Sequence, residues 1–202
     1  LKFGDNEIAV LWSTMANTGR LQMRHLNKSQ TIQILKTKEF DPGNLLFDSS
    51  STIFVTDKSA QPVTIHALFI DQNFQVQVSK LCLNSTLKEI TDMCYVEPLL
   101  IAIDQEVRTT VAINLEADKP IWSTRQFSPS SITSSPDGKL YLIDGGKQVI
   151  EMNARTGTVL QAVLVTGVTE GLGYPISVRW DEFSKRLVVL HGVWNGHEAH
   201  SI

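Results

Sequence analysis

This sequence of 202 residues lacks a long apolar run and lacks any large cluster of basic residues. No apolar stretch approaches the roughly 18 residues that a membrane-spanning helix needs, and the first residues do not resemble a signal peptide. The formal net charge is −3, and Lys and Arg are scattered, so the sequence offers no basic surface for a phosphate backbone. We therefore expect a soluble chain that binds neither membranes nor nucleic acids.

Cysteine is scarce, since only Cys82 and Cys94 are present. The two thiols could form a disulfide in a secreted protein, or they could stay separate in a cytoplasmic one. Asn27 and Asn84 each begin a triplet that fits the N-glycosylation pattern, but a chain this rich in Ser and Thr produces such triplets by chance. The low cysteine content favours a cytoplasmic location, and secretion stays the alternative.

Patterns that carry catalysis or metal binding are also lacking. His191, His197 and His200 do not form the H-E-x-x-H pattern, and in a strand His197 and His200 would point to opposite faces. No Gly-rich phosphate loop, nucleophile elbow or Ser/His/Asp order can be recognised. We therefore expect no catalytic residue, no tightly bound metal and no cofactor.

What the sequence does contain is a series of short apolar runs separated by turn residues. Between residues 128 and 167, the dipeptides Asp137-Gly138, Asp144-Gly145 and Thr156-Gly157 separate runs of strand-forming residues that are too short for helices. We expect four antiparallel strands here, with tight turns at Asp137-Gly138 and Thr156-Gly157. One such sheet buries too little apolar surface to be stable alone, so copies of it are expected elsewhere in the chain.

The second strand of this unit ends at Asp144, and similar apolar runs end at Asp57, Asp104 and His191. Successive ends are 47, 40 and 47 residues apart. A repeat of this length with four short strands is typical of propeller blades. We predict an all-β chain that forms one β-propeller domain, or a fragment of one, of four-stranded antiparallel blades. The expected blades span approximately residues 1–40, 41–87, 88–127, 128–170 and, incompletely, 171–202.

Residues Ser128 to Gly167, and less closely Gly171 to Ile202, resemble an NHL repeat, the blade unit of six-bladed propellers. The resemblance lies in the order of a strand, the Asp137-Gly138 turn, an apolar strand ending in Asp144, a short loop, and a third strand before a Gly turn. NHL propellers are similar to the substrate-recognition ends of invertebrate tripartite-motif proteins. The resemblance thus implies a non-catalytic, cytoplasmic module that binds other proteins or peptides.

The length of the chain allows about four and a half blades of this kind, fewer than a six-bladed or similar propeller contains. An open series of blades would leave sheet faces uncovered. We therefore expect further blades, or another chain, to complete the propeller.

Two other functions fit the same fold. A metal-dependent hydrolase or lyase of the six-bladed class would need acidic or His side chains around its axis, and Asp57, Asp104 and Asp144 do recur at equivalent positions. We interpret these residues instead as caps that bond the backbone amides of the following loops. A secreted carbohydrate-binding propeller, or lectin, would repeat nearly identical pockets in every blade, whereas the copies here differ greatly.

The loops between second and third strands emerge on one face of a propeller, and we predict the partner surface there. In the first blade this loop is expected to start near Trp12, and in the others it follows the ends of the second strands. Large aromatic and cationic side chains in these loops suit a protein or peptide partner. The predicted partner-binding residues are Trp12, Lys58, Arg108, Lys147, Trp194 and His197.

Overall fold

Within the residues that the structure describes, every regular element is a β-strand. This computed structural model describes residues 2–3, 6–15, 18–25, 31–37, 42–47, 52–58, 62–70, 76–81, 87–145, 148–164 and 175–192, with only the backbone described for residues 2–37, 42, 47, 70, 76 and 164. No helix that could cross a membrane occurs in these ranges. The chain divides into two compact units, Leu1–Leu83 and Asn84–Ile202, which are described separately.

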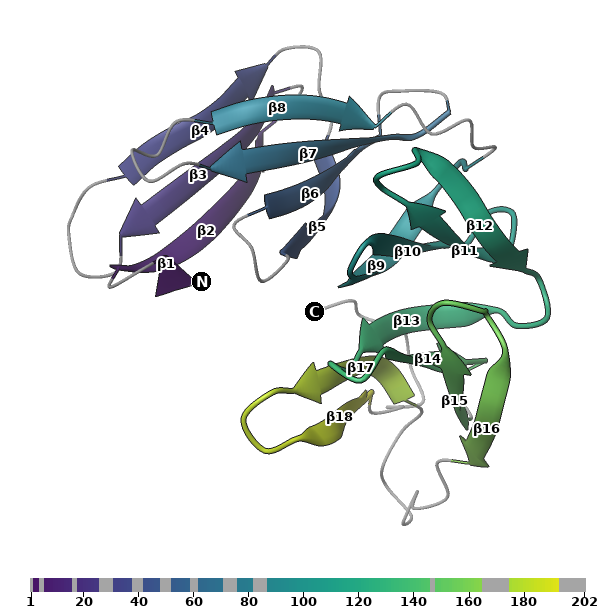
Figure 1. The fold of residues 1–202 in the computed structure, drawn as a ribbon. Coiled ribbons are helices and arrows are strands. Elements are labelled where there is room, and N and C mark those ends of the chain that lie inside the picture. Colours follow the sequence, from purple (N-terminus) through teal and green to yellow (C-terminus); the bar gives the residue numbers. More distant parts are fainter. Residues whose placement is uncertain are drawn as a thin grey trace, which may run out of the picture. The chain divides into compact units, whose positions relative to one another are not determined.

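The first unit contains two four-stranded antiparallel sheets in which the strand order follows the chain order (Figure 1). The strands of its first sheet are β1 (Lys2–Phe3), β2 (Asn6–Met15), β3 (Thr18–His25) and β4 (Thr31–Thr37). The strands of its second sheet are β5 (Pro42–Phe47), β6 (Thr52–Asp57), β7 (Thr64–Ile70) and β8 (Val76–Leu81). Every residue of β6 is buried, because apolar side chains such as Ile53 and Phe54 point to opposite faces of this inner strand.

The second unit continues the same pattern with two more four-stranded sheets and one two-stranded sheet. The strands of the third sheet are β9 (Ile90–Val96), β10 (Leu99–Asp104), β11 (Thr109–Asn114) and β12 (Lys119–Thr124). The fourth sheet contains β13 (Pro129–Ser134), β14 (Lys139–Asp144), β15 (Gln148–Asn153) and β16 (Val159–Leu164). The described part of the fifth sheet contains β17 (Pro175–Asp181) and β18 (Arg186–His191).

The predicted four strands between residues 128 and 167 are confirmed, and so are both predicted turns. Gly138 and Gly157 have φ angles of +79° and +69°, which side chains other than that of glycine rarely allow. At Gly157 space is limiting as well, because an added Cβ would lie 2.7 Å from Cδ2 of Trp122.

The predicted repeat of four-stranded units is also confirmed by the positions of the strands. The second strands β6, β10, β14 and β18 end at the four predicted positions, and each sheet lies within its predicted blade boundaries. The fold class is therefore all-β, with four-stranded antiparallel sheets of the kind that form propeller blades. That these sheets belong to one domain stays a prediction.

In the second unit the sheets pack face to face, and the innermost strands β9, β13 and β17 lie next to one another (Figure 1). Ile101 and Ile103 of the third sheet pack in one apolar core with Ile132 and Leu142 of the fourth. On its opposite face, the fourth sheet packs against Val178 through Ile143 and Val149. Apolar side chains on both faces of β14 thus hold three sheets in one stack.

Aromatic side chains join the same sheets. The Trp122 indole donates a hydrogen bond from Nε1 to the carbonyl of Ala154, at 2.8 Å. The rings of Tyr141 and Trp180 are stacked, with centroids 5.9 Å apart and an interplanar angle of 6°. Each contact links one sheet of the second unit to the next.

Candidate interaction surface and inter-sheet polar cluster

Two of the predicted partner-binding residues lie where the sequence places them, in loops between second and third strands. Lys58 follows β6 in the first unit, and Arg108 lies between β10 and β11 in the second. Both residues are exposed. Arg108 has a φ of +51°, and its loop is fixed because the amide of Val107 donates to Asp104 Oδ1 at 3.2 Å. Their role in binding a partner stays a prediction.

The predicted position of Trp12 is wrong, because this residue lies within β2 and pairs with Leu21 of β3. Pairing of the two strands continues to Met15 and Thr18, so the end of the apolar run does not mark the end of the strand. Lys147, Trp194 and His197 lie outside the described residues. The structure therefore leaves these three predictions untested.

The interpretation of the repeated Asp residues as caps is confirmed at Asp104. Its carboxylate accepts the amide of Val107 in the following loop and, at 2.5 Å, the amide of Lys88 before β9. Asp144 has a similar role, since it accepts the amide of Ser128 at 2.9 Å and the side-chain amide of Gln148 at 3.0 Å. Each Asp thus ties the end of a second strand to the segment that enters the first strand of the same sheet.

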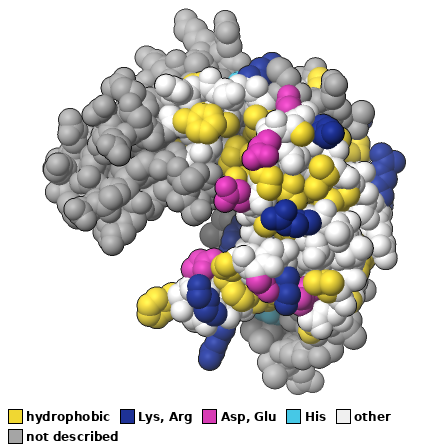
Figure 2. Space-filling view, viewed as in Figure 1, with side chains coloured by type: hydrophobic (Ala, Val, Ile, Leu, Met, Phe, Trp, Pro, Cys, Tyr) yellow, Lys and Arg dark blue, Asp and Glu magenta, His cyan; other side chains and the backbone are white. Residues whose placement is uncertain are grey.

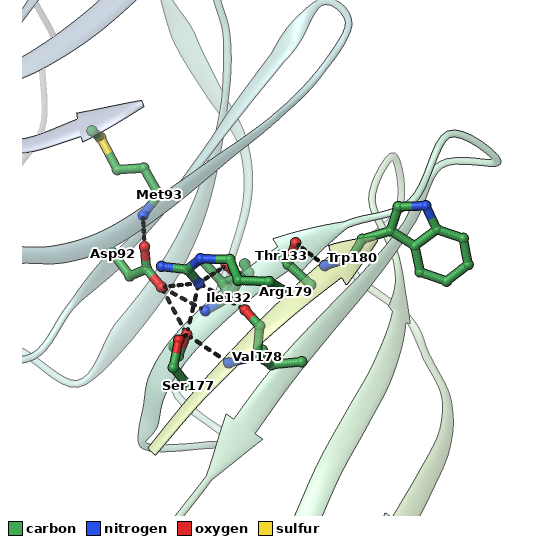
Figure 3. Close-up of polar contacts among 9 residues, drawn as sticks. Asp92, Met93, Ile132, Thr133, Ser177, Val178, Arg179 and Trp180 are labelled. Carbon is green, nitrogen blue, oxygen red and sulfur yellow. Dashed lines mark hydrogen bonds and ion pairs between the residues drawn. The ribbon is translucent and has the colours of Figure 1, made fainter. Parts of the chain in front are cut away.

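A group that the sequence did not predict joins the three innermost strands of the second unit (Figure 3). Asp92 of β9, Ser131 of β13 and Arg179 of β17 lie at its centre. Asp92 Oδ2 accepts hydrogen bonds from Ser131 Oγ at 2.9 Å, from the Ile132 amide at 3.0 Å and from Arg179 Nη1 at 3.1 Å. The Asp92 side chain is largely buried, so three donors from two other strands compensate its charge.

Arg179 is held by carbonyl oxygens as well as by Asp92. Its Nη1 donates to the carbonyls of Ile132 and Val178, at 3.2 and 2.7 Å, and lies 3.0 Å from Ser131 Oγ. All of these contacts involve the same nitrogen of the guanidinium. The rest of the side chain is largely exposed, so the cluster fixes Arg179 while leaving much of it accessible.

Strand pairing shows that Asp92, Ser131 and Ser177 occupy equivalent positions in their sheets. They pair with Ile103, Ile143 and Leu190, and each of these residues is the one before the end of its second strand. Asp92 accepts the amide of Ile132, and Ser131 likewise accepts the amide of Val178, at 3.3 Å. A short polar side chain at this position therefore binds the backbone of the next sheet, and the cluster repeats with the blades.

A sequence signal for these positions exists. Pro42, Pro129 and Pro175 each begin the first strand of a sheet and pair with the residue that ends the second strand. A short polar residue follows two positions later, as the segments PGN, PSS and PIS show. Proline is compatible with a strand at its first residue, where its missing N–H costs no ladder bond. These prolines mark the first strands of three of the five sheets, but not β9, which begins at Ile90.

The hairpin between β17 and β18 displays a large apolar side chain, because Phe183 is 98% exposed. The turn is held by Asp181, whose carboxylate accepts the amides of Phe183 and Ser184, at 3.1 and 3.3 Å, and the Ser184 hydroxyl. The hydrogen bond from Ser184 is the main reason why the pKa of Asp181 is lowered. Lys185 and Glu182 form an ion pair of 2.8 Å beside it. The tip thus shows apolar, basic and acidic side chains together (Figure 2).

Cys94 is a free thiol in the core of the second unit. Burial raises the pKa of this thiol, and the nearby charge of Asp92 raises it further. A buried thiol that stays protonated is a poor nucleophile. Cys82 lies outside the described residues, so a Cys82–Cys94 disulfide stays untested as a prediction.

Comparison with known proteins identifies the fold. No protein-family model matches this chain, and no curated protein matches it either. Solved structures do match it over most of its length, at 13 to 15% sequence identity. They include a nidogen/laminin complex, with a TM-score of 0.62 over 92% of this chain, and a mitotic checkpoint complex, with a TM-score of 0.61 over 95%. The WD40 domain of Toxoplasma gondii coronin matches with a TM-score of 0.61 over 86% of this chain.

This chain spans 70% of the matched chain in the nidogen/laminin complex, 59% in the mitotic checkpoint complex and 46% in coronin. Identity this low establishes similarity of fold and not of function. Together with the repeated four-stranded sheets, the matches assign a β-propeller fold to this chain.

Proposed function

We propose that this chain is a non-catalytic protein-interaction module of the NHL-propeller type, which acts in the cytoplasm and recognises a protein or peptide partner. The main observation in support of this proposal is that the β17–β18 turn exposes the Phe183 side chain almost completely to solvent. The backbone of this turn is held by hydrogen bonds to the Asp181 carboxylate, so little backbone entropy is lost when a partner buries the aromatic side chain. With 98% of its surface exposed, the Phe183 side chain buries almost no apolar area against the described residues.

The matched structures support a protein-interaction function as well. Two of them are protein complexes, one of nidogen with laminin and one of the mitotic checkpoint. Propellers commonly bind partners through loops at the ends of their strands. Phe183 lies between a first and a second strand, whereas Lys58 and Arg108 lie between second and third strands. The two kinds of loop emerge at opposite ends of a sheet, so each kind can be tested separately as a binding site.

Affinity capture from cell extract, followed by measurement of the isolated partner's affinity, tests the proposal. If the hairpin tip is the binding surface, Phe183→Ser should weaken partner binding about tenfold or more, as expected for an aromatic anchor. If a loop between second and third strands binds the partner, Lys58→Ala or Arg108→Ala should have the larger effect. Val78→Ala is the matched control, because Val78 is an exposed apolar residue in β8. Equal affinity for all variants would reject both surfaces.

A further inference from the structure

Four described turns of the second unit are built in the same way. Each begins with an Asp or Asn at the end of a strand, and the side chain of this residue accepts the backbone amide three residues later. These capping residues are Asp104, Asn114, Asn153 and Asp181. The residue after that amide has a positive φ in every case, as Arg108, Asp118, Gly157 and Lys185 show. The capping side chain therefore sets the shape of each turn.

The turn between β17 and β18 differs from the other three at the residue that donates this amide. Val107 and Ala117 have no hydroxyl at this position, and the Thr156 hydroxyl lies 2.7 Å from that of Thr158. Ser184 instead donates its hydroxyl, as well as its amide, to Asp181 Oδ2. Among the four turns, Ser184 is thus the residue whose hydroxyl bonds to the side chain that caps its own turn.

The charge of Asp181 makes this hydroxyl sensitive to chemical change. The hydrogen bond from Ser184 is the main cause that lowers the pKa of Asp181, so the carboxyl is ionised at neutral pH. An anionic group on Ser184 Oγ would remove this hydrogen bond and place a like charge against the carboxylate. In the turn that contains Thr156, the capping residue Asn153 is neutral, so the same change there would meet no opposing charge.

The Ser184 hydroxyl lies in an accessible part of the chain. Ser184 is exposed, and the side chains of Glu182 and Lys185 on either side are 64% and 65% exposed. The amides of Phe183 and Ser184 both donate to Asp181, and Lys185 pairs with Glu182, so these contacts lie within the turn itself. The turn can therefore open locally, as entry into an enzyme's active site requires, without loss of core packing.

We propose that Ser184 is a phosphorylation site for a protein kinase that uses ATP, and that its phosphate opens the β17–β18 turn and so weakens the presentation of Phe183. In the transfer, Ser184 Oγ forms a bond to the γ-phosphorus of ATP, and the bond from that phosphorus to the bridging oxygen of ADP breaks. The hydroxyl proton passes to the kinase and then to solvent. Because Lys185 and Arg186 follow directly, the substrate groove of the kinase must accept cationic side chains.

The phosphate acts on both contacts that fix the turn. It carries a charge of about −1.5 to −2 at neutral pH, and it occupies the position from which the hydroxyl donates to Asp181. It also competes with Glu182 for Lys185, whose Nζ lies 2.8 Å from the Glu182 carboxylate. A Phe183 side chain on an open turn would lose more backbone entropy when a partner buries it. This effect on binding rests on the proposed function and cytoplasmic location, whereas the opening of the turn does not.

Amide exchange of the intact chain tests the opening of the turn without any partner. Phosphoserine incorporated at position 184 should accelerate exchange of the Phe183 and Ser184 amides, followed by NMR, about tenfold or more. Ser184→Ala, which removes the hydroxyl without adding charge, should accelerate it less than about threefold. Asp181→Asn keeps an oxygen that can accept an amide, so in this variant phosphoserine should have less than about a threefold effect. No acceleration by phosphoserine, or the same acceleration in Asp181→Asn, would overturn the proposal.

The turn that begins at Asn153 provides a matched control within the same chain. Ser184→Glu and Thr156→Glu introduce the same charge at equivalent positions, and both residues are exposed. Ser184→Glu should accelerate exchange in its turn about threefold or more, because it faces a carboxylate. Thr156→Glu should change exchange of the Thr156 amide less than about twofold, because Asn153 is neutral. Equal acceleration in the two turns would show that repulsion from Asp181 has no part in the effect.

Phosphorylation itself is tested with purified serine kinases, ATP and the intact chain, and mass spectrometry locates the phosphate. A capped peptide of residues 178–189 measures recognition of the same segment without the fold. A kinase that modifies the peptide should also modify Ser184 of the folded chain, at a rate within about tenfold, because the turn opens locally. Phosphate on the peptide alone, or on neither, would overturn the proposal. If Phe183→Ser leaves partner binding unchanged, the proposed function fails while the exchange and kinase results stand, so the two proposals fail distinguishably.

Discussion

Strands β10 and β18 have equivalent positions in their sheets and similar apolar sequences, LLIAID and RLVVLH, but very different environments. Every residue of β10 is buried, whereas burial in β18 alternates residue by residue. Within the described part of the second unit, β18 has a packed sheet on one face only. An apolar second strand can therefore be buried on both faces, as β10 is, or on alternate residues only, as β18 is.

The largest expected effect is a difference in stability between two equivalent positions. Ile103→Ala should lower the free energy of unfolding by about 3 to 4 kcal/mol, because it leaves a cavity between the third and fourth sheets. Leu190→Ala should cost less than about 1 kcal/mol, because this side chain is already more than half exposed. Chemical denaturation of both variants measures the difference. Equal losses would show that the outer face of β18 is covered.

Asp92 should contribute the next largest effect, because it joins strands of three sheets. Asp92→Ala leaves the Ile132 amide and Ser131 without their acceptor and should cost about 2 kcal/mol. Asp92→Asn keeps an oxygen that can accept the amide, and should cost about half as much. Arg179→Gln should cost less than about 1 kcal/mol, since the guanidinium is largely exposed and the ion pair is screened. Urea denaturation curves would rank the three, and a larger loss in Arg179→Gln than in Asp92→Ala would contradict this order.

Two turn glycines provide a smaller and closely matched comparison. Gly138→Ala should cost about 1 kcal/mol for its positive φ alone, because nothing lies within 4 Å of the added Cβ. Gly157→Ala has a similar backbone cost and also places Cβ against the Trp122 ring, so about 2 kcal/mol is expected. The indole fluorescence of Trp122 should change only in Gly157→Ala. The same stability loss in both variants would mean that the ring contact has no energetic consequence.

The smallest expected effect is a pH dependence in the first unit. Burial lowers the pKa of His66 below its ordinary value of 6.5, and Asp57, 3.7 Å away, offsets this only in part. A lowered pKa means that the unfolded chain binds the proton more tightly, so stability is present above about pH 6.5 and is lost as the pH falls through the lower, folded-state pKa. His66→Gln should reduce this loss. Denaturation midpoints of both proteins, compared at neutral and mildly acidic pH, give the measurement.

Much of the fold follows from local sequence. The Asp-Gly and Thr-Gly turns predict β13 to β16 because positive φ and strand formers lie side by side, and the repeated Asp residues predict the ends of second strands. Trp12 was misplaced because a strand ends where pairing ends and not where its apolar run does. The cluster of Asp92, Ser131 and Arg179 was missed because its members come from three sheets, and one sequence does not show which strands become neighbours. The prolines two residues before Ser131 and Ser177 could have pointed to these two positions, but no such signal precedes Asp92.

The central claim is that equivalent residues of the repeat differ only in whether a following sheet covers them. Labelling of Ile103→Cys and Leu190→Cys with a maleimide under native conditions, with each site quantified by mass spectrometry, tests it most directly. Cys94 provides an internal reference for a buried thiol. The account predicts rapid labelling at position 190, and labelling at position 103 as slow as at Cys94, appearing only when the chain unfolds. Slow labelling at position 190, or rapid labelling at position 103, would contradict it.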